Sequence, residues 1–243
     1  MEGPVVHLRA AARTFGAVQA VHATDLTVET RRCIGLVGHN GSGKSTLLQL
    51  IAGRLRPTAG SVEVDGRDLA TRQGRAHARR FVAVGGATGA FYPDLTVAEH
   101  LELVAIAHGV DEVASRVEAQ LERAELTARR DALPAQLSTG MRQKLDLALA
   151  LIRPSHLLVL DEPDRGLDPA ARRRLWEDVA AYRARGGTVL VATHQPIGLE
   201  RLLDEVLLLE YGEVVARGCL DAVAGTRAGW RLGLQPDAAP EDG

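Results

Sequence analysis

Nine consecutive residues near the start of the chain have the composition of a phosphate-binding loop. They are Gly38, His39, Asn40, Gly41, Ser42, Gly43, Lys44, Ser45 and Thr46, and the first eight match the P-loop pattern G-x-x-x-x-G-K-[ST]. Glycines allow successive backbone N–H groups to curve around an anion, and the positive end of the following helix dipole favours the same charge. We expect the Lys44 ammonium to bind β- and γ-phosphate oxygens and the Ser45 hydroxyl to bind Mg²⁺.

The use of lysine at this position is informative in itself. The chain has 29 basic residues, and only Lys44 and Lys144 among them are lysines. A compact ammonium fits between phosphate oxygens, whereas the planar guanidinium of arginine fits that space poorly. Lysine at position 44 therefore strengthens the prediction of a nucleotide phosphate site.

Two adjacent carboxylates follow an apolar run later in the chain. Residues 157–160 are all apolar and are typical of a buried parallel strand, and Asp161 and Glu162 come directly after them. Ligands of a parallel sheet bind at the carboxyl ends of its strands, and the P-loop follows a similar apolar strand at 33–37. One carboxylate is suited to complete the Mg²⁺ shell, and the second to orient or deprotonate water.

A third motif lies at the start of a predicted helix. Ser138, Thr139 and Gly140 combine a hydroxyl, a position that allows close approach, and a helix N-terminus that attracts anions. Taken alone, this triplet is more typical of an ordinary helix N-cap than of a ligand site.

Taken in order, these motifs resemble those of the ATP-binding cassette (ABC) ATPases. Residues 138–143 resemble the family's signature motif, with Thr139 in place of a glycine and Met141 in place of a glutamine. The resemblance covers about residues 5 to 220. It implies that Phe15 is the aromatic residue that stacks on adenine, that Asp161 is the Walker B carboxylate that binds the metal, and that Glu162 is the catalytic base. It also implies that Asp168 belongs to the D-loop and that His194 is the switch histidine.

The same resemblance implies partners and a location. Two cassettes of this family dimerise head to tail, so that Ser138 of one subunit closes over the γ-phosphate held by Lys44 of the other. The dimer partner is a second copy or a homologue. Residues 93–152 would form the helical subdomain that docks on a membrane permease, at the cytoplasmic face of the cell membrane. ATP and Mg²⁺ are the implied cofactors, and the signature variant resembles exporters whose permease is a separate subunit.

The chain departs from the family pattern at one loop. The family usually has a glutamine near the end of the strand at Val84, where it binds Mg²⁺ and leads into the permease contact, but residues 84–90 contain none. Thr88 or water could supply the missing oxygen. A smaller departure is Asp164, at a position that is often threonine or serine. The missing glutamine predicts weaker or partner-dependent hydrolysis.

Composition narrows the function classes. The formal charge of −2 and an aromatic content of 3% argue against a nucleic-acid partner. Cys33 and Cys219 lie far apart in apolar surroundings, which predicts two buried reduced thiols and neither a disulfide nor a zinc site. The isolated residues His77, His100 and His108 are predicted to be surface or packing residues. No apolar stretch approaches 18 residues, so we expect any membrane role to come through a partner.

The pattern of elements predicts an α/β fold. We expect a P-loop NTPase core with a parallel central sheet, an N-terminal antiparallel β region and a helical subdomain, all in one domain over residues 1–225 with a flexible tail at 226–243. The predicted strands are 5–10, 21–28, 33–37, 61–64, 81–84, 157–160, 188–192, 206–209 and 214–216. The predicted helices are 45–52, 97–107, 110–126, 141–151 and 170–185.

Two other function classes remain open from the sequence. A soluble ABC ATPase acting on ribosomes or DNA is one, but translation-type members carry two cassettes in a chain, and repair-type members insert long coiled coils that are absent between Thr46 and Leu157. The other is a catalytically weak regulatory subunit, which the missing glutamine favours and which Glu162 and His194 oppose.

Overall fold

The centre of the protein is a six-stranded sheet with the strand order β10-β9-β3-β8-β7-β6. The computed structural model describes residues 3–86, 91–194, 196 and 198–226. Five strands of this sheet run parallel, and β10 pairs antiparallel with β9 at one edge. Their bounds are β3 Cys33–Val37, β6 Val82–Gly85, β7 Leu157–Asp161, β8 Thr188–Thr193, β9 Glu205–Glu210 and β10 Glu213–Gly218. Each residue of β3 and β8 is buried, as expected for parallel strands covered on both faces, and the predicted parallel sheet is confirmed.

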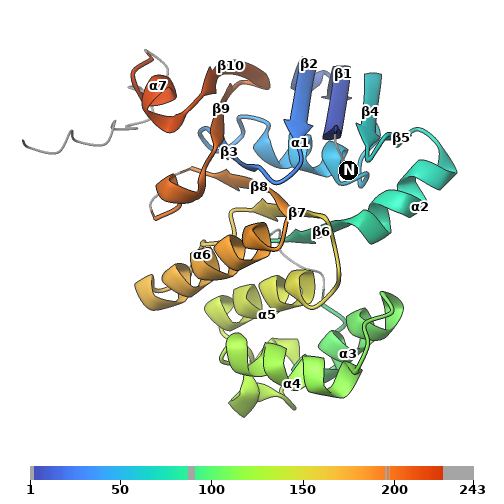
Figure 1. Cartoon of the computed structure of the whole chain (residues 1–243), viewed down its shortest axis with the longest axis vertical. Helices are drawn as coiled ribbons and strands as arrows, with labels where there is room; N and C mark the ends of the chain where they lie inside the picture. The colour runs from blue at the N-terminus through green and yellow to red at the C-terminus, as the bar shows by residue number, and fades with distance from the viewer. Residues whose placement is uncertain (1–2, 87–90, 195, 197, 227–243) are drawn as a thin grey trace, which may run out of the picture.

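A four-stranded antiparallel sheet lies beyond one face of the central sheet (Figure 1). Its strand order is β2-β1-β4-β5, with bounds β1 Pro4–Phe15, β2 Val18–Glu29, β4 Ala59–Val64 and β5 Arg67–Asp68. The β4–β5 turn has φ of 50° at Asp65 and 67° at Gly66, the positive values that two-residue hairpin turns require. The predicted N-terminal antiparallel region is therefore present.

Helices cover both faces of the central sheet. Seven α-helices occur in the described residues: α1 Lys44–Ile51, α2 Arg72–Phe81, α3 Val97–Ala107, α4 Val113–Arg123, α5 Thr139–Leu151, α6 Pro169–Ala184 and α7 Leu220–Ala224. Helix α1 packs in the core between the two sheets, where Leu47 and Ile51 are fully buried. Helices α5 and α6 cover the opposite face, through Ala150, Leu175 and Val179 among others.

Helices α3, α4 and α5 enclose a core of their own at the far end of the molecule from the antiparallel sheet (Figure 1). Leu101, Leu121 and Leu145, one from each helix, are fully buried in it. Thr96 and Glu99 cap α3 reciprocally, which is the capping box that the sequence indicates. Helix α5 contributes to both this core and the core under the central sheet, so it joins the two parts.

The sequence patterns missed two helices, α2 and the short α7, and misplaced several boundaries. Helix α2 was not predicted, because its buried positions Gly74, Ala78 and Phe81 give little apolar signal among arginines. The pattern predicted that Phe81 begins a strand, but Phe81 is the last residue of α2, and β6 begins at Val82. Helix α4 begins at Val113 and not at 110, because Glu112 just before it has a left-handed backbone with φ of 51°.

The prediction of two buried thiols was half wrong. Cys33 is buried in β3, where burial raises the pKa of its thiol to about 12. Cys219 is exposed at the N-cap of α7, a short helix outside the predicted strands. Both are free thiols, as expected. Of the predicted tail at 226–243, only Thr226 is among the described residues.

No helix among the described residues is long and apolar enough to cross a membrane.

Candidate functional site

The P-loop turns between the end of β3 and the start of α1, held by close packing around its glycines. A Cβ at Gly38 would lie 2.3 Å from the backbone oxygen of Leu209 and 2.5 Å from Ser42 Oγ. Gly43, the N-cap of α1, has φ of 103°, and a Cβ there would lie 2.5 Å from the backbone oxygen of Ala20. Side chains at these two positions are therefore excluded, and the loop backbone is fixed before a helix N-terminus that attracts anions.

Lys44 lies at the centre of this loop, with a side chain only 5% exposed. Its Nζ donates to the backbone oxygens of Gly38 at 2.8 Å and His39 at 3.0 Å, and lies 3.8 Å from Glu162 Oε1. Burial lowers the pKa of the Lys44 ammonium, and the nearby charge of Glu162 counters part of that effect. An ammonium has three N–H donors, so one remains for a phosphate oxygen.

Asp161 and Ser45 form a small oxygen cluster beside this lysine. The Ser45 hydroxyl hydrogen-bonds the Asp161 carboxyl, and Asp161 Oδ1 is buried without a hydrogen-bond partner among the described residues. Burial is the main reason that the pKa of Asp161 is raised, and the neighbouring Glu162 charge adds to it. An unpartnered buried carboxylate oxygen beside a hydroxyl fits Mg²⁺, which prefers oxygen ligands and keeps waters or phosphate oxygens in the rest of its shell.

Glu162 and His194 are brought together from different strand ends. Glu162 follows β7 with φ of 50°, and its backbone N–H donates to the Ala192 oxygen of β8 at 2.9 Å. This left-handed turn directs the side chain toward His194, whose Nδ1 lies 2.7 Å from Glu162 Oε2. A carboxylate held by a histidine next to a phosphate-binding lysine is a suitable general base for water.

Lys44, Ser45, Glu162 and His194 line one cleft of about 720 Å³, and Asp161 lies beside it at the Ser45 hydroxyl. Its lining residues are Phe15, Ala20, Asn40, Gly41, Ser42, Gly43, Lys44, Ser45, Thr46, Glu162, Arg165 and His194. Phe15 lies at its edge, 44% exposed, with the Arg13 guanidinium 4.4 Å from the ring centroid. The cleft thus combines an exposed ring, a phosphate-binding loop and a carboxylate in one place.

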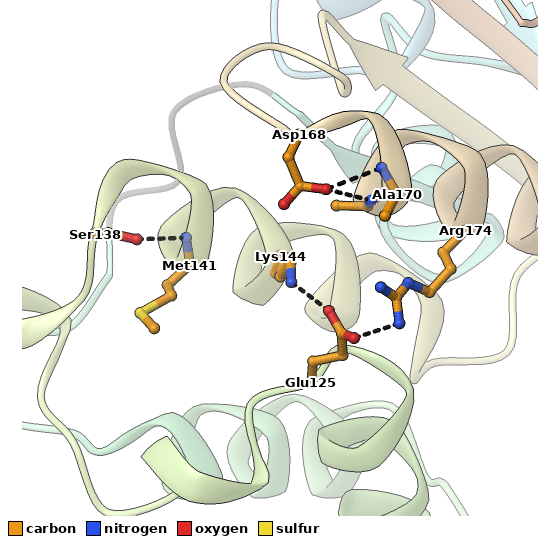
Figure 2. A network of polar contacts seen from close by, with 8 residues as sticks. Glu125, Ser138, Met141, Lys144, Asp168, Ala170 and Arg174 are labelled. Carbon is orange, nitrogen blue, oxygen red and sulfur yellow. Dashed lines mark hydrogen bonds and ion pairs between the residues drawn. The ribbon is translucent and has the colours of Figure 1, made fainter.

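The remaining predicted site residues lie elsewhere. Ser138 is the N-cap of α5 and accepts a hydrogen bond from the Met141 N–H at 3.2 Å, and Asp168 is the N-cap of α6 and accepts from two backbone N–H groups (Figure 2). Thr139 and Gly140 continue α5, and a Cβ on Gly140 would lie 3.2 Å from the Gly166 oxygen. None of these residues lines the cleft. The two helix starts are close to one another but separate from Lys44.

Several residues near the site were not singled out from the sequence. Arg165 lines the cleft, and Tyr211 places its ring 5.0 Å from the His39 ring. Asp146 on α5 accepts a hydrogen bond from the Gly86 N–H at the end of β6, and burial raises its pKa to about 6. A polar residue among the apolar positions of α5 was the available clue to Asp146. Thr88, the suggested substitute for the missing glutamine, lies outside the described residues.

The three isolated histidines are all at least partly buried. His77 pairs with the Asp65 carboxylate at 2.9 Å, and His100 is buried and accepts from the Tyr92 N–H at 3.0 Å. Burial lowers the pKa of His108. Across the residues that the structure describes, no three His, Cys, Asp or Glu side chains gather to hold a metal.

A family model and curated relatives of this chain both indicate the same protein family. The family model described as ABC transporter matches residues 21–165. The chain is 36% identical over 226 residues to the Nod factor export ATP-binding protein I of Burkholderia lata, covering 92% of this chain and 74% of that protein. The protein of the same name from a Bradyrhizobium strain is 36% identical over 225 residues, covering 92% and 73%.

Solved structures agree with this result. The structure of an ATP-binding subunit of an ABC transporter has a TM-score of 0.83 at 31% identity and covers 97% of this chain and 95% of its own. A dimeric ATP-binding cassette in a post-hydrolysis state, bound to ADP and Pi, has a TM-score of 0.81 at 26% identity, covering 88% and 98%. The chain therefore belongs to the ABC transporter family, as an ATP-binding subunit.

Proposed function

We propose that this subunit hydrolyses ATP to power export through a separate membrane permease. The observation that carries the proposal is the convergence of Lys44, Glu162 and His194 on one cleft that also holds Phe15 at its edge. The names of the relatives support the direction of transport, because they describe ATP-binding proteins of an export system.

The residues of the cleft divide the chemistry of phosphoryl transfer to water. The backbone of residues 38–46 and the Lys44 ammonium bind and orient the phosphates, and Phe15 stacks on the adenine. Ser45 and Asp161 hold Mg²⁺, which supplies charge neutralisation on the phosphate oxygens when bound. Glu162 accepts a proton from the attacking water, and His194 holds Glu162 in position through the 2.7 Å contact.

The second half of the site comes from another subunit in this proposal. Ser138, Thr139, Gly140 and Asp168 do not line the cleft of their own chain, although the first three form a helix start that suits an anion. In a head-to-tail dimer, these residues of each subunit would face the phosphates bound by the other. The dimeric cassette bound to ADP and Pi supports a dimer as a precedent for this fold. The partner is a second copy or a homologous cassette.

A groove between the core and the helical region is our candidate for the permease contact. It has a volume of about 860 Å³ and is lined from both parts, by Arg54 and Val84 on one side and by Tyr92, Leu103 and Val104 on the other. Tyr92, which precedes α3, is 61% exposed. On α3 itself, Leu103 is 43% exposed, and Ile106, three residues later on the same helix face, is 67% exposed, so large side chains are accessible at and beside the groove. We propose that residues 93–152 act as the helical subdomain and dock here on the permease, at the cytoplasmic face of the membrane.

The test of hydrolysis is the Glu162→Gln variant. Glutamine keeps the shape of the side chain but cannot accept a proton, so turnover should fall by about 10²-fold or more while ATP affinity stays the same. Hydrolysis is measured as phosphate release and binding with a fluorescent ATP analogue. Wild-type turnover in Glu162→Gln would exclude Glu162 as the base, and an inactive wild-type protein that binds ATP would favour the regulatory-subunit alternative.

The test of the permease contact is a charge placed on the exposed helix surface. Ile106→Glu should remove co-purification of a polytopic membrane protein from detergent-solubilised membranes, because a carboxylate cannot be buried in an apolar contact without a partner. ATP binding should not change. Undiminished co-purification of the permease with Ile106→Glu would place the contact elsewhere.

A further inference from the structure

We propose that Glu125 is a positioning residue that ties the starts of α5 and α6 together, so that Ser138 and Asp168 are presented to the opposing subunit as one rigid surface. This inference rests on the proposed composite site, and it adds a residue that no motif of the family identified. The observations that carry it are a three-way ion pair, a strained backbone and a matching pair of helix positions.

The ion pair joins three separate elements. Glu125 follows the C-terminal end of α4, and its carboxylate accepts from Lys144 Nζ of α5 at 2.6 Å and from the Arg174 guanidinium of α6 (Figure 2). Hydrogen bonding from Lys144 is the main reason that the pKa of Glu125 lies below its usual range, so the carboxylate is ionised at neutral pH. One side chain therefore connects the helical region, the helix that begins at Ser138 and the helix that begins at Asp168.

The two cations occupy equivalent places on their helices. Lys144 lies six residues after the N-cap Ser138, and Arg174 lies six residues after the N-cap Asp168. Holding both cations with one carboxylate therefore fixes the rotation of one helix against the other near their N-terminal ends. The charges of Lys144 and Arg174 also contribute to the lowered pKa of Asp168, after the backbone hydrogen bonds of its cap.

The backbone at Glu125 argues that a side chain is needed there. Its φ is 55°, in the left-handed region that glycine occupies readily and that other residues adopt at a cost. A glycine would end α4 with less strain, yet it could not bind Lys144 and Arg174. Position 125 therefore has a carboxylate side chain, although its backbone conformation favours glycine.

Further contacts join α4 to α6, and α5 to the turn that follows β7. Arg123, at the end of α4, pairs with Asp178 of α6. Gln143 Nε2 of α5 donates to the Pro163 oxygen at 3.0 Å, in the turn that follows Glu162. The Glu125 pairs lie between these contacts, and they are partly exposed, with 42% of the Glu125 side chain accessible. Exposed ion pairs add little to fold stability, so removing this one should leave the fold intact.

The experiment uses the full chain with Glu162→Gln as the parent, because that variant is expected to accumulate an ATP-bound dimer. The quantity measured is the ATP concentration, with Mg²⁺, at which half of the protein elutes as dimer in size-exclusion chromatography with light scattering. Adding Glu125→Gln should raise this concentration about fivefold, the size expected for an exposed ion-pair network. Affinity of the monomer for a fluorescent ATP analogue should not change.

Two further variants separate positioning from stability. Glu125→Gly removes the carboxylate and the backbone strain together, so its midpoint of urea unfolding should equal or exceed that of the parent while its dimerisation is as weak as that of Glu125→Gln. Glu118→Gln is the matched control. It breaks a 2.6 Å pair with Arg130 that is also exposed and that stays within the helical region, so dimerisation should be unaffected.

A double-mutant cycle with Arg174→Gln completes the test. If the carboxylate acts through Arg174, the effect of Arg174→Gln on dimerisation should largely disappear once Glu125→Gln is present. Parent-like dimerisation of Glu125→Gln, or an equal loss in Glu118→Gln, would overturn the role of Glu125 while leaving the composite site intact. A parent protein that stays monomeric with ATP would instead overturn the composite site, and the role of Glu125 with it.

Discussion

The phosphate-binding cleft and the surface formed by the starts of α5 and α6 both offer groups that attract anions, but their polar atoms are used differently. In and beside the cleft, the Lys44 side chain is 5% exposed, and the buried atoms Ser42 Oγ and Asp161 Oδ1 have no hydrogen-bond partner among the described residues. At the helix starts, Ser138 and Asp168 are exposed and already satisfy backbone N–H groups of their own helices.

This difference indicates where each region finds its ligand. Buried polar atoms without partners are costly, and in the proposed function a bound nucleotide and metal would satisfy these two. The helix starts are complete as parts of the fold and face outward. Mutations in the cleft are therefore expected to change ATP binding by the monomer, and mutations at the helix starts are expected to change dimerisation.

The largest separation should come from the two lysines. Lys44→Ala removes the buried ammonium from the phosphate site, and we expect ATP affinity to fall by about 100-fold or more because a charge-assisted partner of the phosphates is lost. Lys144→Ala, the matched control, lies on α5 outside the cleft and should leave monomer affinity unchanged. Titration with a fluorescent ATP analogue measures both. Equal losses in the two variants would break the distinction between the regions.

One glycine from each region provides a second comparison, in which the free energy of unfolding is measured. Gly38→Ala places a Cβ 2.3 Å from a backbone oxygen and should lower the free energy of unfolding by about 3 kcal/mol through forced backbone movement. At Gly140 the nearest atom lies 3.2 Å away and alanine has the better helix propensity, so Gly140→Ala should change stability by less than about 1 kcal/mol. Urea unfolding measures both changes. A large destabilisation by Gly140→Ala would mean that the α5 start is packed as tightly as the cleft.

Asp146 on α5, which accepts a hydrogen bond from the Gly86 N–H after β6, should make stability depend on pH. Its folded pKa of about 6 exceeds the ordinary 3.8, so between those values the native state binds more protons than the unfolded chain. Its contribution to stability therefore falls as pH rises from about 4 to about 6 and stays low above that, with an upper limit near about 3 kcal/mol. Asp146→Asn should remove this fall. The same pH dependence of urea unfolding in both proteins would show that Asp146 titrates normally.

The smallest expected effect compares two helix caps. Ser138→Ala and Thr71→Ala each remove a side chain that accepts a backbone N–H, at the starts of α5 and α2, and each should cost about 1 kcal/mol in unfolding free energy. Only Ser138→Ala should also weaken ATP-driven dimerisation in the Glu162→Gln parent. A similar loss of dimer with Thr71→Ala would mean that helix stability, and not the Ser138 hydroxyl, controls assembly.

The sequence was most informative where one residue type is required. Lys44 and the glycines around it predict their loop because few other residues fit, and the apolar strands β3, β7 and β8 follow from continuous burial. Helix α2 was missed because an arginine-rich helix on a small contact has almost no apolar periodicity.

Contacts between distant segments were the other gap. Glu125 meets Lys144 and Arg174, 19 and 49 residues away, through packing of three helices that no local pattern encodes. Asp146 reaches Gly86 across 60 residues in the same way. Motifs could identify the chemistry of the cleft, whereas the residues that hold its parts in place became visible only in the fold.

The central claim is that the start of α5 serves the opposing subunit and not its own cleft. Its most direct test is Ser138→Arg in the Glu162→Gln parent, followed by ATP affinity of the monomer and by dimerisation with ATP and Mg²⁺. We predict parent-like affinity, because Ser138 lies outside the cleft, together with a protein that stays monomeric. A dimer that forms as readily as that of the parent, or a loss of monomer affinity, would contradict the claim.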